Sequence, residues 1–259
     1  LLAATWDLTN FGDQERTPND FKLMTEVISW FDLVAIQEIA DDLSHLRKLM
    51  KHLPGYSVIL SDVGGNEERA DFLYDSNKVN RLELAIKVAV TPSEQKYIRM
   101  KGVSGSFKGF DRNPYAVAFK AGGLEFIAVS VHLFFGSHSY FNEDRRALEA
   151  LALSKWAEKR HEASEAYSQN ILSMGDYNLP KRKEKNNVFR GFTANGFILP
   201  EHSTSMGSNL KGDKHYDQVA FHSGGMKNAY TGKSGVFDFD KKPLFKSAWN
   251  VSRDYFKRL

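Results

Sequence analysis

Cysteine is absent from this chain of 259 residues. Without thiols the protein has no disulfide framework, no thiolate zinc site and no cysteine nucleophile. Long apolar runs are missing too, since none approaches the roughly 20 residues that a membrane-spanning helix requires. No linker rich in proline, glycine or serine divides the chain, and no internal repeat is visible. We therefore expect a single domain over residues 1–259 and no membrane partner.

A strong excess of one charge is also lacking. The formal net charge of +3 permits a polyanionic partner without requiring one. The hydrophobic share of 42% is ordinary for a globular protein with a substantial core. The chain opens on a strand-like run without a signal peptide. The absence of cysteine is compatible with the cytoplasm and with secretion from a bacterium, so the compartment stays open. We expect a monomer.

The pattern of apolar residues predicts strands and helices that alternate at first, with strands dominating later. Thr17-Pro18 is typical of a helix start, and Ala121-Gly122-Gly123 is typical of a hairpin turn. Mixed connections of this kind favour an α/β sandwich with helices outside two packed sheets. Predicted strands cover Ala3–Leu8, Leu33–Ile36, Tyr56–Leu60, Ala70–Tyr74, Leu82–Val90, Tyr115–Lys120, Leu124–Val131, Ile171–Met174 and Asp217–Phe221, and predicted helices cover Thr17–Trp30, a segment opening at Asp41-Asp42, Asn142–Glu165 and Val188–Asn195.

Polar groups stand at the ends of several predicted strands. The apolar run from Ile171 ends in Gly175-Asp176-Tyr177-Asn178 and is stopped by Pro180. A polar pair beside a core needs partners, and this pair suits a cation or a phosphate. Each such group alone is equally well explained as a helix cap, a turn or a surface ion pair. Their recurrence predicts one shared site, and the other members are Asp7, Glu38, Glu68, Arg112, His132 and Asp217.

The ordered set of these motifs resembles the endonuclease/exonuclease/phosphatase superfamily, and most of all its deoxyribonuclease-I-like bacterial nucleases. The matching segments span roughly residues 3–221: Trp6-Asp7, Gln37-Glu38, Glu68-Arg69, Arg112-Asn113-Pro114, Val131-His132, Gly175-Asp176-Tyr177-Asn178 and Tyr216-Asp217-Gln218. The resemblance implies an α/β fold, a four-layer sandwich of two mixed β-sheets packed face to face with helices outside. It also implies phosphoester hydrolysis with a divalent metal. Mg²⁺ is expected, and Mn²⁺ or Ca²⁺ would suit the same oxygen ligands.

The resemblance carries roles over to individual residues. Glu38 looks like the main metal ligand, and Asp7 stands beside the metal where the family usually has Asn. His132 looks like the general acid/base, with Glu68 orienting its ring. The remaining implied roles are Asp176 and Asn178 for the nucleophilic water and the phosphate, Arg112 for a phosphate contact, and Asp217 as the partner of a second histidine.

The sequence departs from the family pattern at two places. Asp7 adds a negative charge near a phosphate, which would repel substrate or bind the metal more strongly. The Ser-Asp-His segment that ordinarily opens the family's last core strand is missing: no histidine follows His222, and Ser252-Arg253-Asp254-Tyr255-Phe256 offers an Asp alone. We expect a truncated chain that lacks its last strand, rather than a natural loss of the second histidine.

The leading hypothesis is therefore a metal-dependent nuclease. An activated water attacks a phosphodiester of nucleic acid, DNA being favoured, with His132 as acid/base. The basic stretch Lys181–Lys185 either grips the nucleic-acid backbone or is a solvated loop. Arg145 and Arg146 either reach phosphate or pair with Glu149 along their helix. The alternatives are a phosphatase or phosphodiesterase for a small phosphorylated molecule, and a catalytically degenerate binding module.

Overall fold

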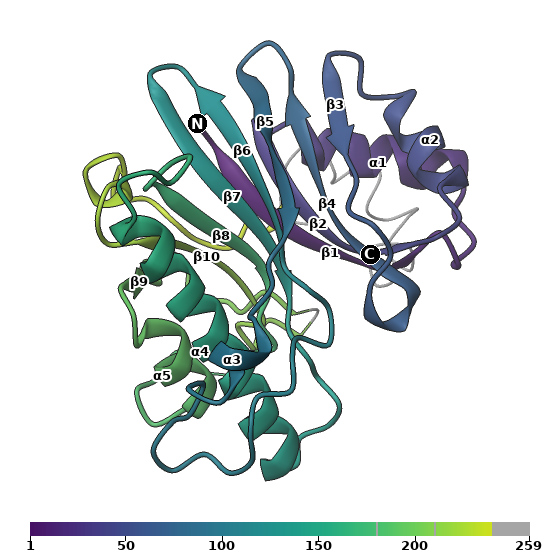
Figure 1. Ribbon diagram of the computed structural model, residues 1–259. Coiled ribbons are helices and arrows are strands. Elements are labelled where there is room, and N and C mark those ends of the chain that lie inside the picture. Colours follow the sequence, from purple (N-terminus) through teal and green to yellow (C-terminus); the bar gives the residue numbers. More distant parts are fainter. Residues whose placement is uncertain (180, 210, 240–259) are drawn as a thin grey trace.

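The computed structural model describes residues 1–179, 181–209 and 211–239 (Figure 1). The predicted stop at Pro180 and the segment Ser252–Phe256 lie outside the described residues. Two β-sheets pack against each other, and helices cover their outer faces. Both sheets are mixed, because each contains one parallel pair beside antiparallel pairs. The predicted α/β sandwich is confirmed. No helix of the described part is long and apolar enough to cross a membrane.

The first sheet has the strand order β1-β2-β4-β3. The helix α1 begins as the sequence predicts: the Thr17 side chain accepts from the Asp20 backbone N–H, and Asp20 caps Thr17 in return. The second helix begins slightly later than predicted, because the Asp42 carboxylate accepts from Ser44 and α2 starts there. The elements are β1 (Ala3–Phe11), α1 (Pro18–Ile28), β2 (Leu33–Ala40), α2 (Ser44–Met50), β3 (Tyr56–Ile59) and β4 (Glu68–Asp75).

The second sheet has the strand order β5-β6-β7-β8-β10-β9. The long helix α4 and the short α5 pack on its outer face (Figure 1). The strands are β5 (Val79–Lys87), β6 (Tyr115–Ala121), β7 (Leu124–His132), β8 (Ile171–Asp176), β9 (Phe197–Ile198) and β10 (Asp217–His222), and the helices are α3 (Pro92–Gln95), α4 (Tyr140–Glu162) and α5 (Asn187–Thr193). Short 3₁₀ turns occupy Gly65–Glu67 and Met226–Asn228.

One predicted strand is displaced. The sequence predicts a strand over Leu82–Val90, but β5 spans Val79–Lys87. The strand begins early because a tight turn, in which Lys78 N–H donates to the Asp75 carbonyl, reverses the chain straight into β5. Its first residues pair with the end of β6. Their polar side chains face solvent, so the pattern of apolar residues did not indicate a strand there.

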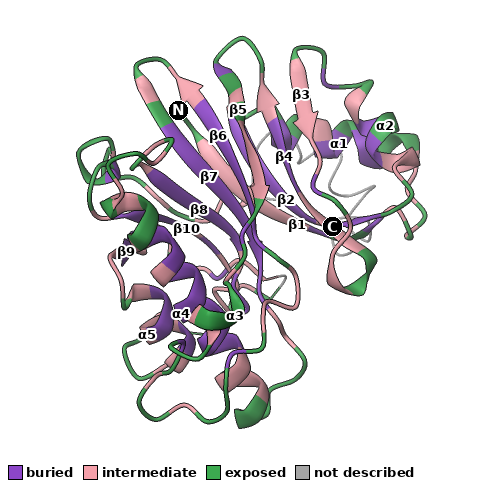
Figure 2. Cartoon of the chain, in the orientation of Figure 1, coloured by how far each residue is buried: buried purple, intermediate pink, exposed green. Residues whose placement is uncertain are grey.

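Apolar side chains form a core in each gap between layers. The inner core between the sheets contains Phe72, Phe119 and Met174. Separate cores join the first sheet to α1 and α2, and the second sheet to α4 and α5. Figure 2 shows this as buried central strands and helix faces that are buried only toward the sheets. The strand backbones are thereby held rigidly, so side chains at their ends have defined positions.

Strand register brings several predicted site residues together. His132, at the end of β7, pairs with Asp176 at the end of β8. Asp176 in turn pairs with Asp217, the first residue of β10. In the facing sheet, Asp7 of β1 pairs with Gln37, the residue before Glu38. Asp7 and Glu38 do not end their strands as predicted, because β1 continues to Phe11 and β2 to Ala40, whereas His132 and Asp176 do end theirs.

Candidate active site

His132 lies at the centre of the candidate site, with 5% of its surface exposed. Its Nδ1 lies 3.3 Å from Glu68 Oε2, and its Nε2 lies 3.9 Å from Glu38 Oε1. Burial by itself lowers the pKa of His132, but the Glu68 and Asp176 carboxylates outweigh it and raise the pKa above its usual value. The imidazole is therefore held between carboxylates and able to carry a proton near neutral pH.

Glu68 joins His132 to Arg112. The Arg112 Nε donates to Glu68 Oε2 at 2.7 Å, and the pair is nearly buried. Burial acts to raise the pKa of Glu68, but its bonds to His132 and Arg112 lower it overall, so Glu68 stays ionised. A second Arg112 nitrogen lies 3.4 Å from Asp111 Oδ2. The arginine that was predicted to contact phosphate thus lines the cavity while bound to two carboxylates.

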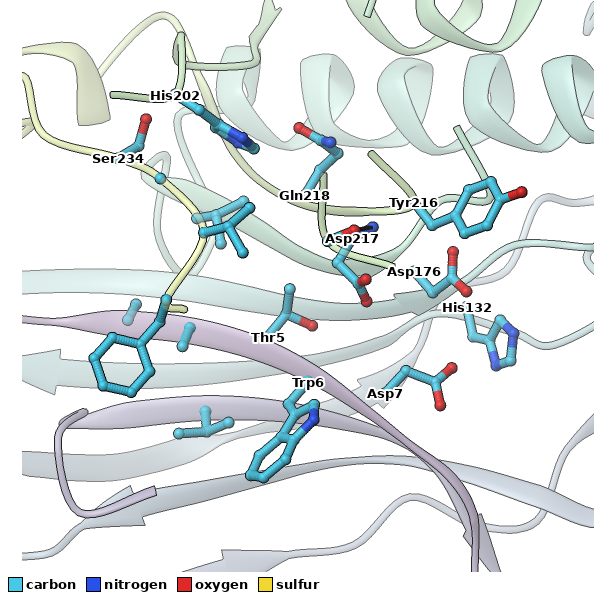
Figure 3. A pocket seen from close by; sticks show the side chains of 18 of the residues that line it. Thr5, Trp6, Asp7, His132, Asp176, His202, Tyr216, Asp217, Gln218 and Ser234 are labelled. Carbon is cyan, nitrogen blue, oxygen red and sulfur yellow. Dashed lines mark hydrogen bonds between the residues drawn. The ribbon is translucent and has the colours of Figure 1, made fainter. Parts of the chain in front are cut away.

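Three further carboxylates crowd the other side of the imidazole. Figure 3 shows Asp7, Asp176 and Asp217 gathered beside His132. Burial, followed by repulsion from Glu38, raises the pKa of Asp7 to about 7. Burial also raises the pKa of Asp176, and burial with repulsion from Asp176 and Asp7 raises that of Asp217 well above its usual range. Such like charges are held together at a cost that a bound cation would offset.

A local distortion of β2 positions Glu38. The pairing of β2 with β4 is irregular between Ile36 and Ile39, and Glu38 has a φ of 59°. Positive φ is uncommon for a residue with a side chain, and such strain collects at functional sites. Glu38 Oε2 accepts from the backbone N–H of Asn10 at 2.9 Å. The irregularity therefore changes the direction of the Glu38 side chain within β2, which continues to Ala40.

The donor set fits a divalent cation. Among the described residues, two groups of three offer ligand atoms within 4.8 Å of one another: Asp7, His132 and Asp176, and Glu38, Glu68 and His132. The two predicted metal ligands, Glu38 and Asp7, fall in different groups that share His132. Carboxylate oxygens are the donors that Mg²⁺, Mn²⁺ and Ca²⁺ prefer. The buried Asp217 Oδ1 also has no hydrogen-bond partner among the described residues, which leaves acceptor capacity at the site.

Asn178 closes the turn that follows β8. Its backbone N–H donates to Asp176 Oδ1 at 2.5 Å, and its Nδ2 donates to the Leu133 carbonyl at 2.9 Å. The buried Arg146 donates to the Asn178 carbonyl at 3.0 Å. Asn178 therefore fixes the chain after β8 against the chain after β7. Its side chain lines the cavity, and its contact with phosphate stays a prediction.

The sequence alone did not identify Glu149 as part of the site. This fully buried residue of α4 accepts from the backbone N–H groups of Asp111 and Phe134, at 3.1 and 3.0 Å. It thereby ties together the loops that carry Arg112 and follow His132. Arg145 pairs with Asp111 at 2.7 Å and lies 3.7 Å from Glu149, as the ion-pair alternative predicts. The four-residue spacing of Arg145 and Glu149 indicated an ion pair along the helix. It did not indicate that Glu149 also binds the two loops.

A cavity of about 1860 Å³ opens at the site. It runs from His132 past Asp217 to His202 and Ser234 (Figure 3). Glu38 and Arg112 also line it. Pockets for small ligands usually measure about 300–1,000 Å³. The cavity is therefore large enough for a substrate that extends beyond its reacting group.

No protein-family model matches the sequence, and no curated protein matches it. Solved structures do resemble the fold. A mannosyl-6-phosphatase from Bacteroides thetaiotaomicron superposes with a TM-score of 0.59 at 16% identity, covering 86% of each chain. An endonuclease/exonuclease/phosphatase family protein from the same organism has a TM-score of 0.58 at 15% identity, covering 86% of this chain and 82% of its own. TDP2 from D. rerio, complexed with a single-strand DNA product, has a TM-score of 0.57 at 14% identity, covering 87% of this chain and 85% of its own. The resemblance to this superfamily is confirmed at the level of the fold.

Proposed function

We propose that this chain, whose fold is that of endonuclease/exonuclease/phosphatase proteins, is a metal-dependent phosphodiesterase that hydrolyses nucleic acid, DNA in particular. One observation carries the proposal: the buried His132 stands between the Glu68–Arg112 pair and a cluster of carboxylates. The size of the cavity and the DNA product bound by the TDP2 relative favour nucleic acid.

The residues divide the chemistry between the two sides of the imidazole. Glu38 and Asp7 would hold the cation, which when bound offsets charge on the phosphoryl oxygens and lowers the pKa of a water. Glu68 beside Nδ1 fixes the tautomer of His132 and leaves Nε2 to exchange a proton with the substrate. Asp176 and Asn178 orient the attacking water and the phosphate, and Arg112 adds positive charge beside them. The family resemblance implies that Asp217 would orient a second histidine, but no histidine follows His222 in this sequence, so Asp217 contributes its carboxylate alone.

A phosphatase acting on a small phosphorylated molecule is the second candidate. The mannosyl-6-phosphatase relative favours it, since its structure is as similar to this chain as those of the other relatives. A degenerate binding module is the third, favoured by Asp7 in place of the usual Asn. The three candidates differ in whether the protein cleaves DNA, hydrolyses a sugar phosphate faster, or binds DNA without cleaving it.

The test measures cleavage of plasmid DNA, single-stranded oligonucleotides, a chromogenic phosphodiester and a panel of sugar phosphates, with Mg²⁺ or Mn²⁺. We expect cleavage of DNA and a loss of about 100-fold or more in His132→Ala, because acid/base groups contribute that much. Glu38→Gln should lose metal dependence together with activity. His52→Ala, an exposed histidine on the far side of the first sheet, is the control and should retain full activity.

Three results would contradict the nuclease. Intact plasmid with either metal would count against it, and so would faster hydrolysis of a sugar phosphate than of DNA. DNA binding that persists in EDTA without cleavage would favour the binding module.

A further inference from the structure

Aromatic side chains are concentrated in the chain immediately after His132. The segment Phe134–Phe141, here called the aromatic segment, contains four aromatic residues and His138 among eight positions. Phe134, Phe135 and His138 line the cavity. Tyr140 and Phe141, the first residues of α4, are 90% and 73% exposed. A row of rings therefore leads from the reacting centre to the open surface.

The inner rings of this row are held in place, and the outer ones are presented to solvent. The Arg145 guanidinium lies 3.8 Å from the centre of the Phe134 ring, and Phe135 packs edge-on against His138. The capping Ser139 accepts from the Asn142 N–H and fixes the start of α4. Two neighbouring aromatic side chains exposed to this degree cost free energy in water, which a ligand that covers them would recover.

A positively charged loop lies beside the aromatic segment. Residues 181–185, here called the basic loop, follow Asn178 of the site and have the sequence Lys-Arg-Lys-Glu-Lys, with Lys181, Lys183 and Lys185 exposed. Asn186, directly after the loop, donates to Glu143 Oε1 at 2.9 Å, and so holds the loop against the first turn of α4. This bond brings the basic loop next to the helix turn that bears the two exposed rings.

We propose that the aromatic segment and the basic loop form a stacking platform for unpaired bases, so that the protein binds single-stranded nucleic acid in preference to duplex. Any base offers a π-face to an aromatic ring, whereas paired bases inside a duplex do not expose theirs. The lysines suit the phosphates of the same strand. A small sugar phosphate has neither stacking bases nor a row of phosphates. This proposal rests on the proposed nuclease function and names its substrate.

Binding is measured first, in the His132→Ala background so that the strand is not cut. Fluorescence anisotropy of a labelled single-stranded oligonucleotide is compared with that of the matching duplex. We expect tighter binding of the single strand, and a loss of about 25-fold or more when Tyr140→Ala and Phe141→Ala are combined, since each stack contributes at least about fivefold. Tyr97→Ala is the control, because Tyr97 is 65% exposed but lies outside the aromatic segment. Equal binding of both forms, or no loss in the double variant, would overturn the proposal.

Salt dependence tests the basic loop separately. Changing Lys181, Lys183 and Lys185 to Gln should reduce the slope of log affinity against log salt by about 2, because each phosphate contact on a single strand contributes about 0.7. The matched control changes the exposed Arg47, Lys48 and Lys51 in and just after α2, on the opposite side of the molecule (Figure 1), and should leave the slope as it is. Equal slopes in the two triple variants would contradict a role for the loop.

Turnover separates this proposal from the proposed function. The ratio of kcat/KM for a single strand to that for the chromogenic diester should fall about 25-fold in the Tyr140→Ala/Phe141→Ala variant, mainly through KM. If the wild-type protein cleaves neither substrate, the nuclease assignment fails. If it cleaves both and the ratio is unchanged in the variant, the platform alone is wrong.

Discussion

The charges of single buried residues dominate the candidate site. Asp7 shows this best, because its half-buried carboxylate lies beside Glu38 and Asp176 and its pKa is raised to about 7. The resemblance to known nucleases placed Asp7 where an Asn is usual, and the structure shows the physical consequence. An Asn would have no charge to repel its neighbours, whereas Asp7 is tolerated if it is protonated or if a cation lies next to it.

This difference predicts how stability depends on pH without metal. The pKa of Asp7 rises from an ordinary value of 3.8, which the unfolded chain retains, to about 7 in the fold. Between these values the folded state binds more protons than the unfolded state, so the contribution of Asp7 to stability falls as pH rises and levels off above about 7. The wild-type protein loses stability between pH 5 and pH 8. Asp7→Asn should make this loss of unfolding free energy smaller by on the order of 1 kcal/mol or more. The pH dependence of stability that remains in Asp7→Asn comes from Asp176 and Asp217, whose pKa values are also raised.

Thermal unfolding in EDTA, repeated with Mg²⁺, measures the effect. Mg²⁺ should stabilise the wild-type protein more at pH 8 than at pH 5, since protons compete for the ligands. Asp7→Asn with an unchanged pH slope would contradict the assigned burial and repulsion.

Among the elements, the pair β7 and β8 matters most, because their register brings His132 next to Asp176. Close approach of the two strands depends on Gly175. A Cβ at this residue would lie 1.8 Å from the Val131 carbonyl oxygen, and its φ of +154° is rarely adopted by other residues. The glycine before Asp176 is therefore part of the geometry of the site, beyond ending an apolar run.

Gly175→Ala should be destabilising by about 2 kcal/mol or more, because the strands must separate to admit the methyl group. Chemical denaturation measures the loss, and kcat should fall as His132 and Asp176 move apart. Gly123→Ala, in the open hairpin between β6 and β7, has no described atom within 4 Å of the new Cβ and should change little. Similar losses in both variants would show that the close contact is unimportant.

At the scale of the whole molecule, the two sheets must face each other correctly for the site to form. A buried polar contact crosses the gap between them: Gln37 Nε2 donates to Ser130 Oγ at 3.1 Å, and Gln37 Oε1 accepts from Thr5 at 3.0 Å. Gln37 and Ser130 lie one and two residues from Glu38 and His132. The contact therefore specifies how the strand that carries Glu38 meets the strand that carries His132.

A double-mutant cycle tests this contact. Gln37→Ala and Ser130→Ala should each cost about 1–3 kcal/mol by leaving a buried polar partner unsatisfied. The double variant should lose about 1 kcal/mol less than the sum, because neither partner then remains. The exposed pair Ser57 and Ser76, whose hydroxyls lie 2.7 Å apart, is the control and should show little coupling. A coupling near zero for Gln37 and Ser130 would mean that apolar packing alone aligns the sheets.

Local patterns determined much of what the structure contains. Apolar periodicity placed most strands and long helices within a few residues, and Thr17-Pro18 marked the start of α1, because such signals act over one or two turns of chain. The ordered motifs also predicted the sandwich and named residues that do lie together, among them His132, Glu68 and Asp176. The early start of β5 was missed, since its polar residues face solvent.

Tertiary structure decided the rest, because it depends on contacts between distant parts of the chain. That Arg112 is bound to Glu68, that Glu149 ties two loops together, and that Asp7 and Glu38 meet through His132 all follow from how two sheets and α4 pack. The aromatic segment and the basic loop are distant in the chain and come together through the bond from Asn186 to Glu143. The sequence by itself determined which chemical groups the protein has and which strands carry them, but not that β1 and β2 continue past Asp7 and Glu38. Only packing decided which of those groups became partners, because burial and register set their distances, charges and protonation.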